Sequence, residues 1–309
     1  MKQLQKYTWL IETIRRAGSI SHRDLSDAWE RKKDLSDARP LPRATFNRWR
    51  NAIRKQFGIN IDCHHAGDYQ YYIENPDDID DDKLKKWMLN SFATGNLIGE
   101  NFSLKDRILV DDIPSGQSHL TTLLEAMTDN RITRITYRPF SLERAATFLI
   151  EPYCVKLFEN RWYVLAHNDF FDDMRIYALD RIESVEITDK TFRLPKGFSA
   201  SQFFSTAYGI VMANDVKPRR IVIRANEAHK HYLLSLPLHH TQSLIADHGE
   251  YADFDAYLAP TYDFIMKLLQ AGAMIEVISP EDVRNNIRGW ISDMHHLYND
   301  SNTETSQNQ

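Results

Sequence analysis

The stretch Glu151-Pro-Tyr-Cys-Val-Lys-Leu-Phe-Glu-Asn-Arg-Trp-Tyr-Val-Leu-Ala-His167 carries the clearest structural pattern in the sequence. Both halves are rich in aromatic and β-branched residues, and only Glu159-Asn-Arg161 separates them, a length that suits a tight hairpin. Residues 174–182 then alternate with period two, so one set of side chains faces a core and the other an open surface. The sequence therefore predicts a hairpin followed by a third strand.

One face of the third strand carries Arg175 and Tyr177. The other candidates for that face are Tyr153 and either Trp162 or Tyr163, depending on the register of the hairpin. An arginine beside tyrosines on a small curved sheet suits an anionic ligand that carries a stackable ring.

These residues also resemble a known family, the WYL domain of bacterial transcription regulators. The resemblance lies in Pro152-Tyr153, in residues 160–163 and in residues 175–182. It implies a small Sm-like (SH3-like) β-barrel between an N-terminal winged helix-turn-helix and a C-terminal extension of the WCX type. Valine replaces the leucine of the naming triplet at position 164, and Ala178 lies where many relatives carry a second basic residue. Because of the alanine at position 178, the resemblance predicts the identity of the ligand less closely than it predicts the fold.

The resemblance further implies an effector site, because WYL barrels are thought to sense nucleotides or single-stranded nucleic acid. The candidate ligand-binding residues are Tyr137, Arg138, Tyr153, Trp162, Tyr163, Arg175, Tyr177 and Arg181. Aromatic strand residues are more often core residues than ligand contacts. An arginine on a strand is equally well an edge charge or, for Arg181, a partner of Asp180.

The charge of the chain is distributed unevenly. The 309 residues, 42% of them apolar, suffice for two or three domains with real cores. Residues 1–75 contain 14 Lys/Arg and 9 Asp/Glu, whereas the rest contains 24 Lys/Arg and 34 Asp/Glu, although the net charge is only −5. This asymmetry indicates an N-terminal part that binds a polyanion.

The basic part has the helix pattern of a winged helix-turn-helix. Apolar residues at helical spacing predict a helix over residues 4–17, and Ser21 is expected to cap a second helix. A polar connection over residues 34–41 leads to Pro42, which suits a first helical turn. A third helix is predicted over residues 43–57, followed by two strands that bracket Ala66-Gly67-Asp68 as a wing hairpin.

We expect the third helix to be the recognition helix that contacts DNA. Phe46, Trp49, Ile53 and Phe57 form its core stripe, and no acidic residue occurs between positions 43 and 61. A basic helix of this kind fits the major groove. The candidate DNA-binding residues are Arg43, Thr45, Asn47, Arg48, Arg50, Asn51, Arg54 and Lys55. A basic exposed helix that is merely solvated is the alternative.

The expected fold is a multidomain α+β protein: a winged helix-turn-helix, a small Sm/SH3-like barrel and a C-terminal α+β sandwich. A helix from Lys83 carries apolar residues that must pack either on a partner subunit or on the chain's own barrel. The expected boundaries are 1–75 for the DNA-binding domain, 76–118 for linker helices, 119–195 for the WYL barrel, 196–216 for a linker, 217–299 for the C-terminal extension and 300–309 for a disordered tail.

No catalytic motif is found: the sequence has no Gly-rich phosphate loop, nucleophile elbow, His-Glu-x-x-His or Cys-x-x-Cys. Adjacent histidines occur at 64–65, 239–240 and 295–296, but neighbouring side chains diverge on strands and helices, so no metal site and no cofactor are expected. Two cysteines, no apolar run of membrane-spanning length and a polar N-terminus are typical of a cytoplasmic protein without a membrane partner.

Together these patterns predict a non-enzymatic, DNA-binding transcription regulator. We expect a homodimer on a palindromic operator, acting as a repressor, with a nucleotide or single-stranded nucleic-acid effector. The alternative is a single-strand-sensing effector or accessory protein that regulates no promoter. Some members of the resembled family control phage-defence genes, which is a possible context for this chain.

Overall fold

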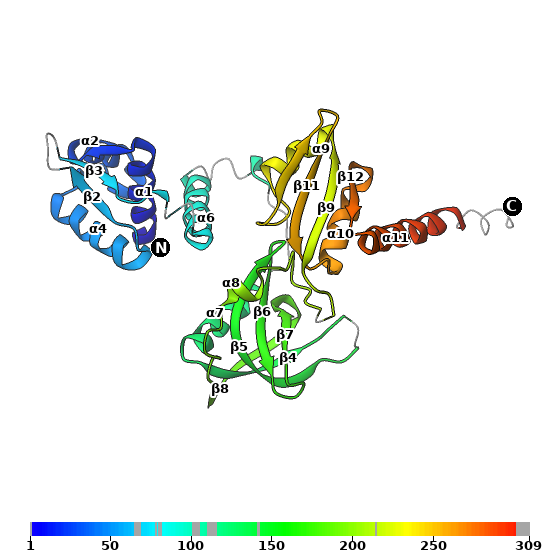
Figure 1. The fold of residues 1–309 in the computed structure, drawn as a ribbon. Coiled ribbons are helices and arrows are strands. Elements are labelled where there is room, and N and C mark those ends of the chain that lie inside the picture. Colours follow the sequence, from blue (N-terminus) through cyan, green and yellow to red (C-terminus); the bar gives the residue numbers. More distant parts are fainter. Residues whose placement is uncertain are drawn as a thin grey trace. The chain divides into compact units, whose positions relative to one another are not determined.

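The computed structural model describes residues 2–64, 69–77, 79, 82–100, 106–109, 116–140, 143–213 and 215–300. It divides the chain into two compact units, Met1–Asp111 and Asp112–Gln309. Each unit mixes helices with antiparallel sheets, which agrees with the expected multidomain α+β class (Figure 1). Within the described residues, no helix combines the length and the apolar character needed to cross a bilayer.

The first unit consists of helices around a small sheet. The strands pair in the order β1-β3-β2, and β1 is antiparallel to β3. Gly18 and Gly58 end helices with φ of 70° and 66°, a conformation that glycine adopts without a Cβ penalty. The elements are α1 (Lys2–Ala17), β1 (Ser19–Ser21), α2 (His22–Arg31), α3 (Lys33–Ser36), α4 (Arg43–Phe57), β2 (Ile61–His64), β3 (Gln70–Ile73) and α6 (Lys83–Glu100).

An aromatic core holds the first unit together. Trp49 of α4 is 2% exposed and packs edge-on against Tyr7 of α1 and Trp29 of α2. Phe46, one turn earlier on α4, packs edge-on against Tyr71 of β3. The helical stripe of α4 therefore joins two other helices and the sheet.

Several expectations for this unit are confirmed. The third helix has the expected bounds, and its four stripe residues are buried. Ser21 caps α2, because its Oγ accepts a hydrogen bond from the backbone N–H of Asp24 at 3.1 Å. The two strands of the expected wing hairpin form β2 and β3, while its tip at residues 66–68 lies outside the described residues.

Three local features differ from the expectation. The connection over residues 34–41 is not wholly irregular, since α3 forms one turn there with Asp37 in the left-handed region at its end. Pro42 is the residue before α4 rather than its first residue, because its ψ of 141° is extended. Part of the apolar side of α6 packs on a surface that the sequence did not indicate: Leu89 is buried in the core of the first unit, where α6 contacts α1, while Leu84 and Trp87 are exposed.

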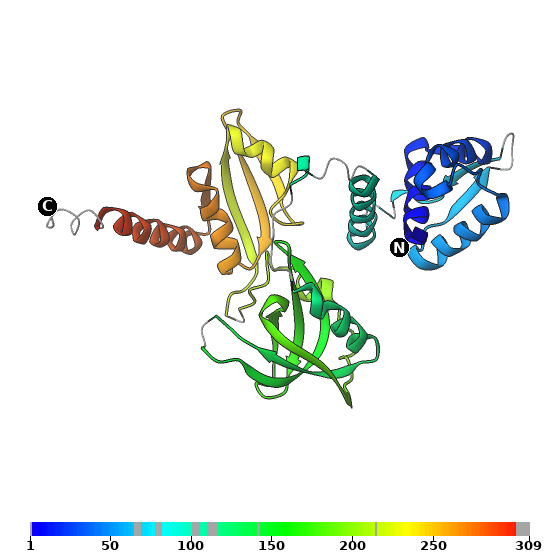
Figure 2. The same cartoon turned by 180° about the vertical axis from the view of Figure 1, so that it is seen from behind.

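The first half of the second unit is a curved five-stranded antiparallel sheet with strand order β7-β6-β5-β4-β8. Glu159 and Asn160 form its two-residue hairpin turn with φ of 47° and 63°, as the primed hairpin turns require. Helix α7 packs against β4, β5 and β8 (Figure 2). The elements are α7 (Gln117–Thr128), β4 (Arg131–Tyr137), β5 (Ala146–Phe158), β6 (Arg161–Asn168), β7 (Asp173–Ala178), the 3-10 turn η2 (Leu179–Arg181) and β8 (Ile182–Thr191).

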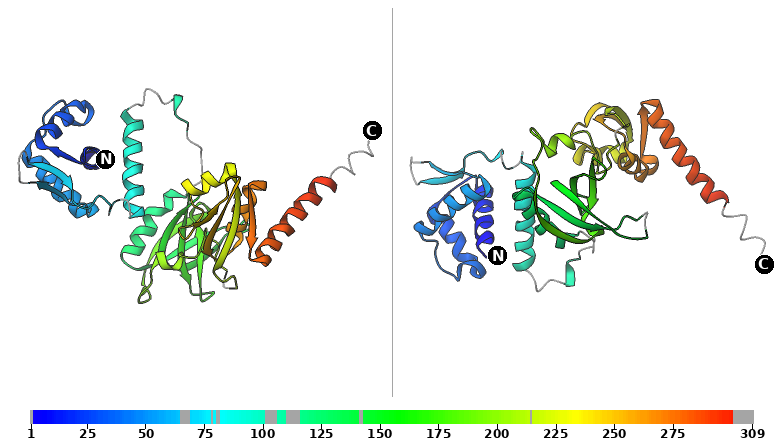
Figure 3. Two further views of the ribbon diagram at one scale, coloured as in Figure 1. Left: turned by 45° about the horizontal axis from the view of Figure 1, so that its top comes forward. Right: turned by 90° about the horizontal axis from the view of Figure 1, so that it is seen from below.

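The second half of this unit is a two-layer α+β fold, as expected. Four strands pair in the order β10-β11-β9-β12, and helix α11 projects from them (Figure 3). Alternate residues of β9 and β11 are buried beneath α9 and α10, with Phe254 packed in the same core as Phe264. The elements are α8 (Ala200–Phe203), β9 (Arg219–Asn226), α9 (Glu227–Ser235), β10 (Ser243–Asp247), β11 (Tyr251–Leu258), α10 (Tyr262–Gln270), the 3-10 turn η3 (Gly272–Met274), β12 (Ile275–Ser279) and α11 (Glu281–Asp300).

Candidate nucleic-acid interfaces

Helix α4 presents a basic face opposite its buried stripe. The exposed side chains on that face are Arg43, Asn47, Arg48, Asn51, Arg54 and Lys55, and Thr45 beside them is half-buried. Among the described residues, no acid lies within ion-pair distance of the four cations in this set, whereas Lys85 of the same unit pairs with Asp82 at 3.4 Å. We call these seven residues the α4 face. Its cations are available to bind phosphate, and its asparagines can hydrogen-bond base edges.

Arg50 does not belong to this exposed set. Its guanidinium Nε donates to the backbone carbonyl of Ile61 at 3.0 Å, and its Cζ lies 5.2 Å from the ring centroid of Tyr71. The side chain therefore fixes α4 to the first residue of β2 and to β3. Spacing on the helix did not separate this structural arginine from its exposed neighbours, because the hydrogen bond depends on where the hairpin packs.

The register of the second unit resolves which aromatic residue shares a face with Arg175. Val164 lies opposite Tyr177, and Ala166 lies opposite Arg175. Since directly opposed residues point to the same side, Trp162 lies on the Arg175 face and Tyr163 on the other. Of the two residues that the sequence left as alternatives, Trp162 and not Tyr163 therefore shares a face with Arg175.

Two of the candidate tyrosines lie in the core instead of at an open surface. Tyr177 is 6% exposed and packs edge-on against Tyr137 with ring centroids 5.2 Å apart. Its hydroxyl accepts a hydrogen bond from the side-chain amide of Asn168 at 2.8 Å. Burial raises the pKa of Tyr177 above its ordinary value. These contacts favour the packing role that aromatic strand residues usually have.

Tyr153 and Tyr163 have other surroundings. The ring of Tyr153 stacks on Phe192 with centroids 5.7 Å apart, and its hydroxyl donates to Glu151 at 3.3 Å. Tyr163 is 9% exposed, and burial raises its pKa. The register places Tyr163 on the face of the sheet opposite to Arg175.

The two arginines of the ligand motif each lie flat on an exposed phenylalanine. The guanidinium Cζ of Arg175 is 3.6 Å from the ring centroid of Phe171, and that of Arg181 is 3.8 Å from the centroid of Phe140. Both rings belong to loops, and Phe140 is 79% exposed. A guanidinium that lies over a ring in this way can still donate from its exposed N–H groups to a phosphate, although Nε of Arg181 is itself buried.

The one other basic candidate, Arg138, is neutralised by an ion pair with Glu183. Asp180, which the sequence offered as one alternative partner for Arg181, instead accepts a hydrogen bond from Arg161 at 3.1 Å. Among the described residues, the interaction found for the guanidinium group of Arg181 is therefore its contact with the ring of Phe140.

The eight candidate ligand residues therefore do not converge on one point. The structure brings Tyr137 and Tyr177 together in the core and leaves Arg175 and Arg181 in separate stacked pairs. Sequence reasoning missed Phe140 and Phe171. The available signal was Phe170-Phe171 within an otherwise polar loop, since exposed aromatic residues among aspartates are seldom placed there for packing.

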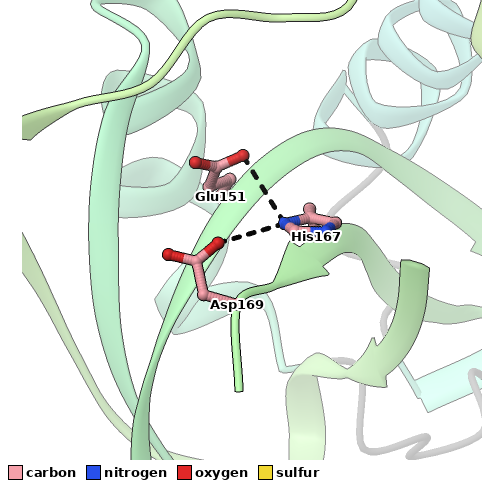
Figure 4. A group of neighbouring side chains, drawn as sticks. All are labelled: Glu151, His167 and Asp169. Atoms are coloured by element: carbon pink, nitrogen blue, oxygen red, sulfur yellow. Dashed lines mark ion pairs between the residues drawn. The ribbon is translucent and has the colours of Figure 1, made fainter. Parts of the chain in front are cut away.

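A cluster of metal-ligand type lies at the end of β6, in a place that the histidine spacing did not indicate. Glu151, His167 and Asp169 bring one donor atom each to within 4.8 Å of one another (Figure 4). The carboxylate oxygens of Asp169 and Glu151 lie 3.2 and 3.8 Å from Nδ1 of His167. Among the described residues this is the only group of this kind.

A small curved antiparallel sheet preceded by one packed helix defines the central domain of the chain. Residues 118–187, which span α7 and β4 to most of β8, match the WYL domain family, so the chain contains a WYL domain. No curated protein matches the chain.

Several solved structures resemble the chain. Proteasome accessory factor B/C (PafBC) of Arthrobacter aurescens is 17% identical with a TM-score of 0.36, and the match covers 92% of this chain and 45% of that one. A CRISPR Cas-related protein is 12% identical with a TM-score of 0.41, covering 60% of this chain and 53% of that one. The chain thus spans about half the length of each.

Proposed function

We propose that this protein is a DNA-binding transcription regulator controlled by an effector. Residues 1–75 act as a winged helix-turn-helix whose α4 face enters the major groove of operator DNA. The WYL domain, with an Sm-like barrel fold, binds a nucleotide or single-stranded nucleic acid. The regulator works as a homodimer on a palindromic site, and it represses because a dimer on promoter DNA blocks polymerase.

The unneutralised α4 face is the observation that carries this proposal. Arg43, Arg48, Arg54 and Lys55 are exposed on one helix, and no described acid pairs with them. Binding of such cations to phosphates releases condensed counterions and so gives affinity for duplex DNA. The exposed amides of Asn47 and Asn51 supply the donors and acceptors that a bidentate contact with adenine needs.

The arginine–phenylalanine pairs support the effector part. Arg175 and Arg181 offer phosphate contacts beside the rings of Phe171 and Phe140, on which a base can stack. An effector that binds one dimer arrangement more tightly shifts the population toward it. The separation of the two α4 helices then changes, and operator affinity changes with it.

The test is selection of duplex sites from a random pool by the full-length chain, followed by fluorescence anisotropy on the selected site. The expected result is a symmetric site bound far more tightly than random duplex, with affinity falling steeply as salt rises. Lys55→Ala should weaken binding to all duplexes alike and lower the salt slope by about one. Selection of no symmetric site, together with a flat salt dependence, would reject the regulator.

One observation favours a second candidate function. The two stacked pairs suit single strands whether or not α4 binds an operator, so the chain is alternatively a single-strand-sensing accessory protein. That function predicts tight binding of single-stranded oligonucleotides that Lys55→Ala leaves unchanged, with no selected duplex site.

A further inference from the structure

The β5–β6 hairpin places Glu151 directly opposite His167, after a register shift between Pro152 and Cys154. The loop that follows β6 brings the carboxylates of Asp169 and Asp172 close to the imidazole of His167. Oδ1 of Asp169 lies 3.2 Å from Nδ1 of His167, and Oδ1 of Asp172 lies 3.4 Å from Nε2. Both ring nitrogens therefore face acids.

The two nitrogens differ in what they face. Among the described acids, only Asp172 lies within ion-pair distance of Nε2, whereas oxygens of both Asp169 and Glu151 lie within that distance of Nδ1. When Nε2 carries the proton and donates it to Asp172, the lone pair of Nδ1 points between two carboxylates. A histidine held by a carboxylate at its far nitrogen is the usual arrangement of a metal-ligating histidine.

The charge at this place is uncompensated within the described part of the chain. No lysine or arginine there forms an ion pair with Glu151, Asp169 or Asp172. The side chains of Glu151 and His167 are only 19% and 24% exposed, whereas those of Asp169 and Asp172 are 67% and 97% exposed, so solvent screens the repulsion between Glu151 and the two aspartates only in part.

We propose that Glu151, His167 and Asp169 bind a divalent transition-metal ion of the Zn²⁺ class. One imidazole and two carboxylates form a nitrogen–oxygen donor set that Zn²⁺ accepts, with a fourth position left for water or a ligand oxygen. Zn²⁺ bonds of about 2.0–2.2 Å place tetrahedral donors roughly 3.4 Å apart. The distance of 3.2 Å between Asp169 and Nδ1 of His167 is already close to this value. The distance of 3.8 Å between Glu151 and the same nitrogen must shorten by a few tenths of an ångström.

The site has a consequence for the loop between β6 and β7. Asp169 and Asp172 lie in the same loop as Phe171, whose ring supports the guanidinium of Arg175. Metal binding fixes this loop from the side of the sheet opposite to Arg175, because His167 and Ala166 are adjacent on β6. The bound ion therefore restricts the motion of Phe171 and of Arg175 above it. This effect on Arg175 rests on the proposed function, in which Arg175 binds the effector.

The experiment is calorimetric titration of the metal-free full-length protein with ZnCl₂. One ion should bind per chain with release of protons, since a proton competes for the same nitrogen. Glu151→Gln and Asp169→Asn should each abolish this site. Asp172→Asn, which removes only the carboxylate at Nε2, should weaken binding about 10–100-fold. The matched control is the double variant His295→Gln/His296→Gln on α11, which should bind as the wild type does.

Two results would overturn the site: unchanged Zn²⁺ binding in Glu151→Gln and Asp169→Asn, or loss of binding in the α11 control. Thermal unfolding guards against misfolded variants, because Zn²⁺ should raise the Tm of the wild type and of the control but not of Asp169→Asn. No nucleic acid enters these measurements, so their failure is separate from failure of the proposed regulator. Zn²⁺ should in addition tighten oligonucleotide binding by the wild type and leave Asp169→Asn unaffected.

Discussion

Exposed arginines occur in both units, but their surroundings differ. Among the described residues of the second unit, eight arginines form ion pairs with acids, four of them across neighbouring strands: Arg131, Arg134, Arg138, Arg161, Arg219, Arg220, Arg224 and Arg284. On the α4 face of the first unit, no described acid pairs with Arg43, Arg48 or Arg54. The same residue type therefore has an acidic partner in one region and none in the other.

The difference shows why neutralisation matters more than net charge. A paired arginine must give up its carboxylate before it can bind a phosphate, and the exchange gains little. An unpaired arginine gives up only water and counterions. Arg175 and Arg181 are exceptions within the second unit, since they stack on phenylalanines and leave exposed N–H groups for a ligand.

The largest effect is expected on the buried side of α4. Trp49→Ala removes a side chain that is 2% exposed and contacts Tyr7 and Trp29. The loss should lower the free energy of unfolding of the first unit by about 3–5 kcal/mol. Thermal unfolding should show the first unit melting earlier while the second unit is unchanged. A shift of both transitions together would mean that the two units do not unfold independently.

The second-largest effect is expected at an exposed residue of the same helix. Arg48, adjacent to Trp49, is exposed and unpaired, so Arg48→Ala should leave the unfolding midpoint within about 1 °C of wild type. Binding to a selected duplex should weaken by about 1–3 kcal/mol if the guanidinium contacts a base edge. Anisotropy at fixed salt measures the affinity. Intact DNA binding would place recognition elsewhere than on the α4 face.

Much of the first unit could be predicted from the sequence because its signals are local. The stripe of Phe46, Trp49, Ile53 and Phe57 fixes both the helix and its buried side through spacing alone. The cap at Ser21 likewise depends on residues three apart. The helix that begins at Lys83 shows the limit of such signals: its apolar side was evident, but its packing against α1 is a long-range contact.

The candidate sites of the second unit could not be predicted in the same way. A two-residue turn at Glu159-Asn160 fixes the hairpin register only near the turn, and the shift between Cys154 and Pro152 is what places Glu151 opposite His167. Ion pairs such as Arg131 with Asp189 join residues 58 positions apart. The sequence could therefore name arginines and acids, but it could not say which of them neutralise one another.

A smaller effect is expected at the stacked pair. Arg175→Ala should weaken binding of a single-stranded oligonucleotide by about 1.5 kcal/mol, roughly tenfold, because one hydrogen bond to a charged group is lost. Duplex binding by α4 should not change. The control is Arg138→Ala, which removes an equal charge from an arginine that is paired with Glu183. Equal losses in the two variants, measured by anisotropy, would show that stacking on Phe171 confers no advantage.

The smallest effect is expected at a paired arginine. Arg134 and Glu186 lie directly opposite each other on β4 and β8, with Nη1 3.0 Å from Oε2, and both side chains are more than half exposed. Removing one partner of such a pair should change the free energy of unfolding by less than about 1 kcal/mol. Arg134→Ala removes the same unit of positive charge as Arg48→Ala, so net charge alone predicts equal losses of duplex affinity. If only an unneutralised cation binds phosphate, Arg134→Ala should leave the salt slope and the affinity unchanged, and equal losses would refute the distinction.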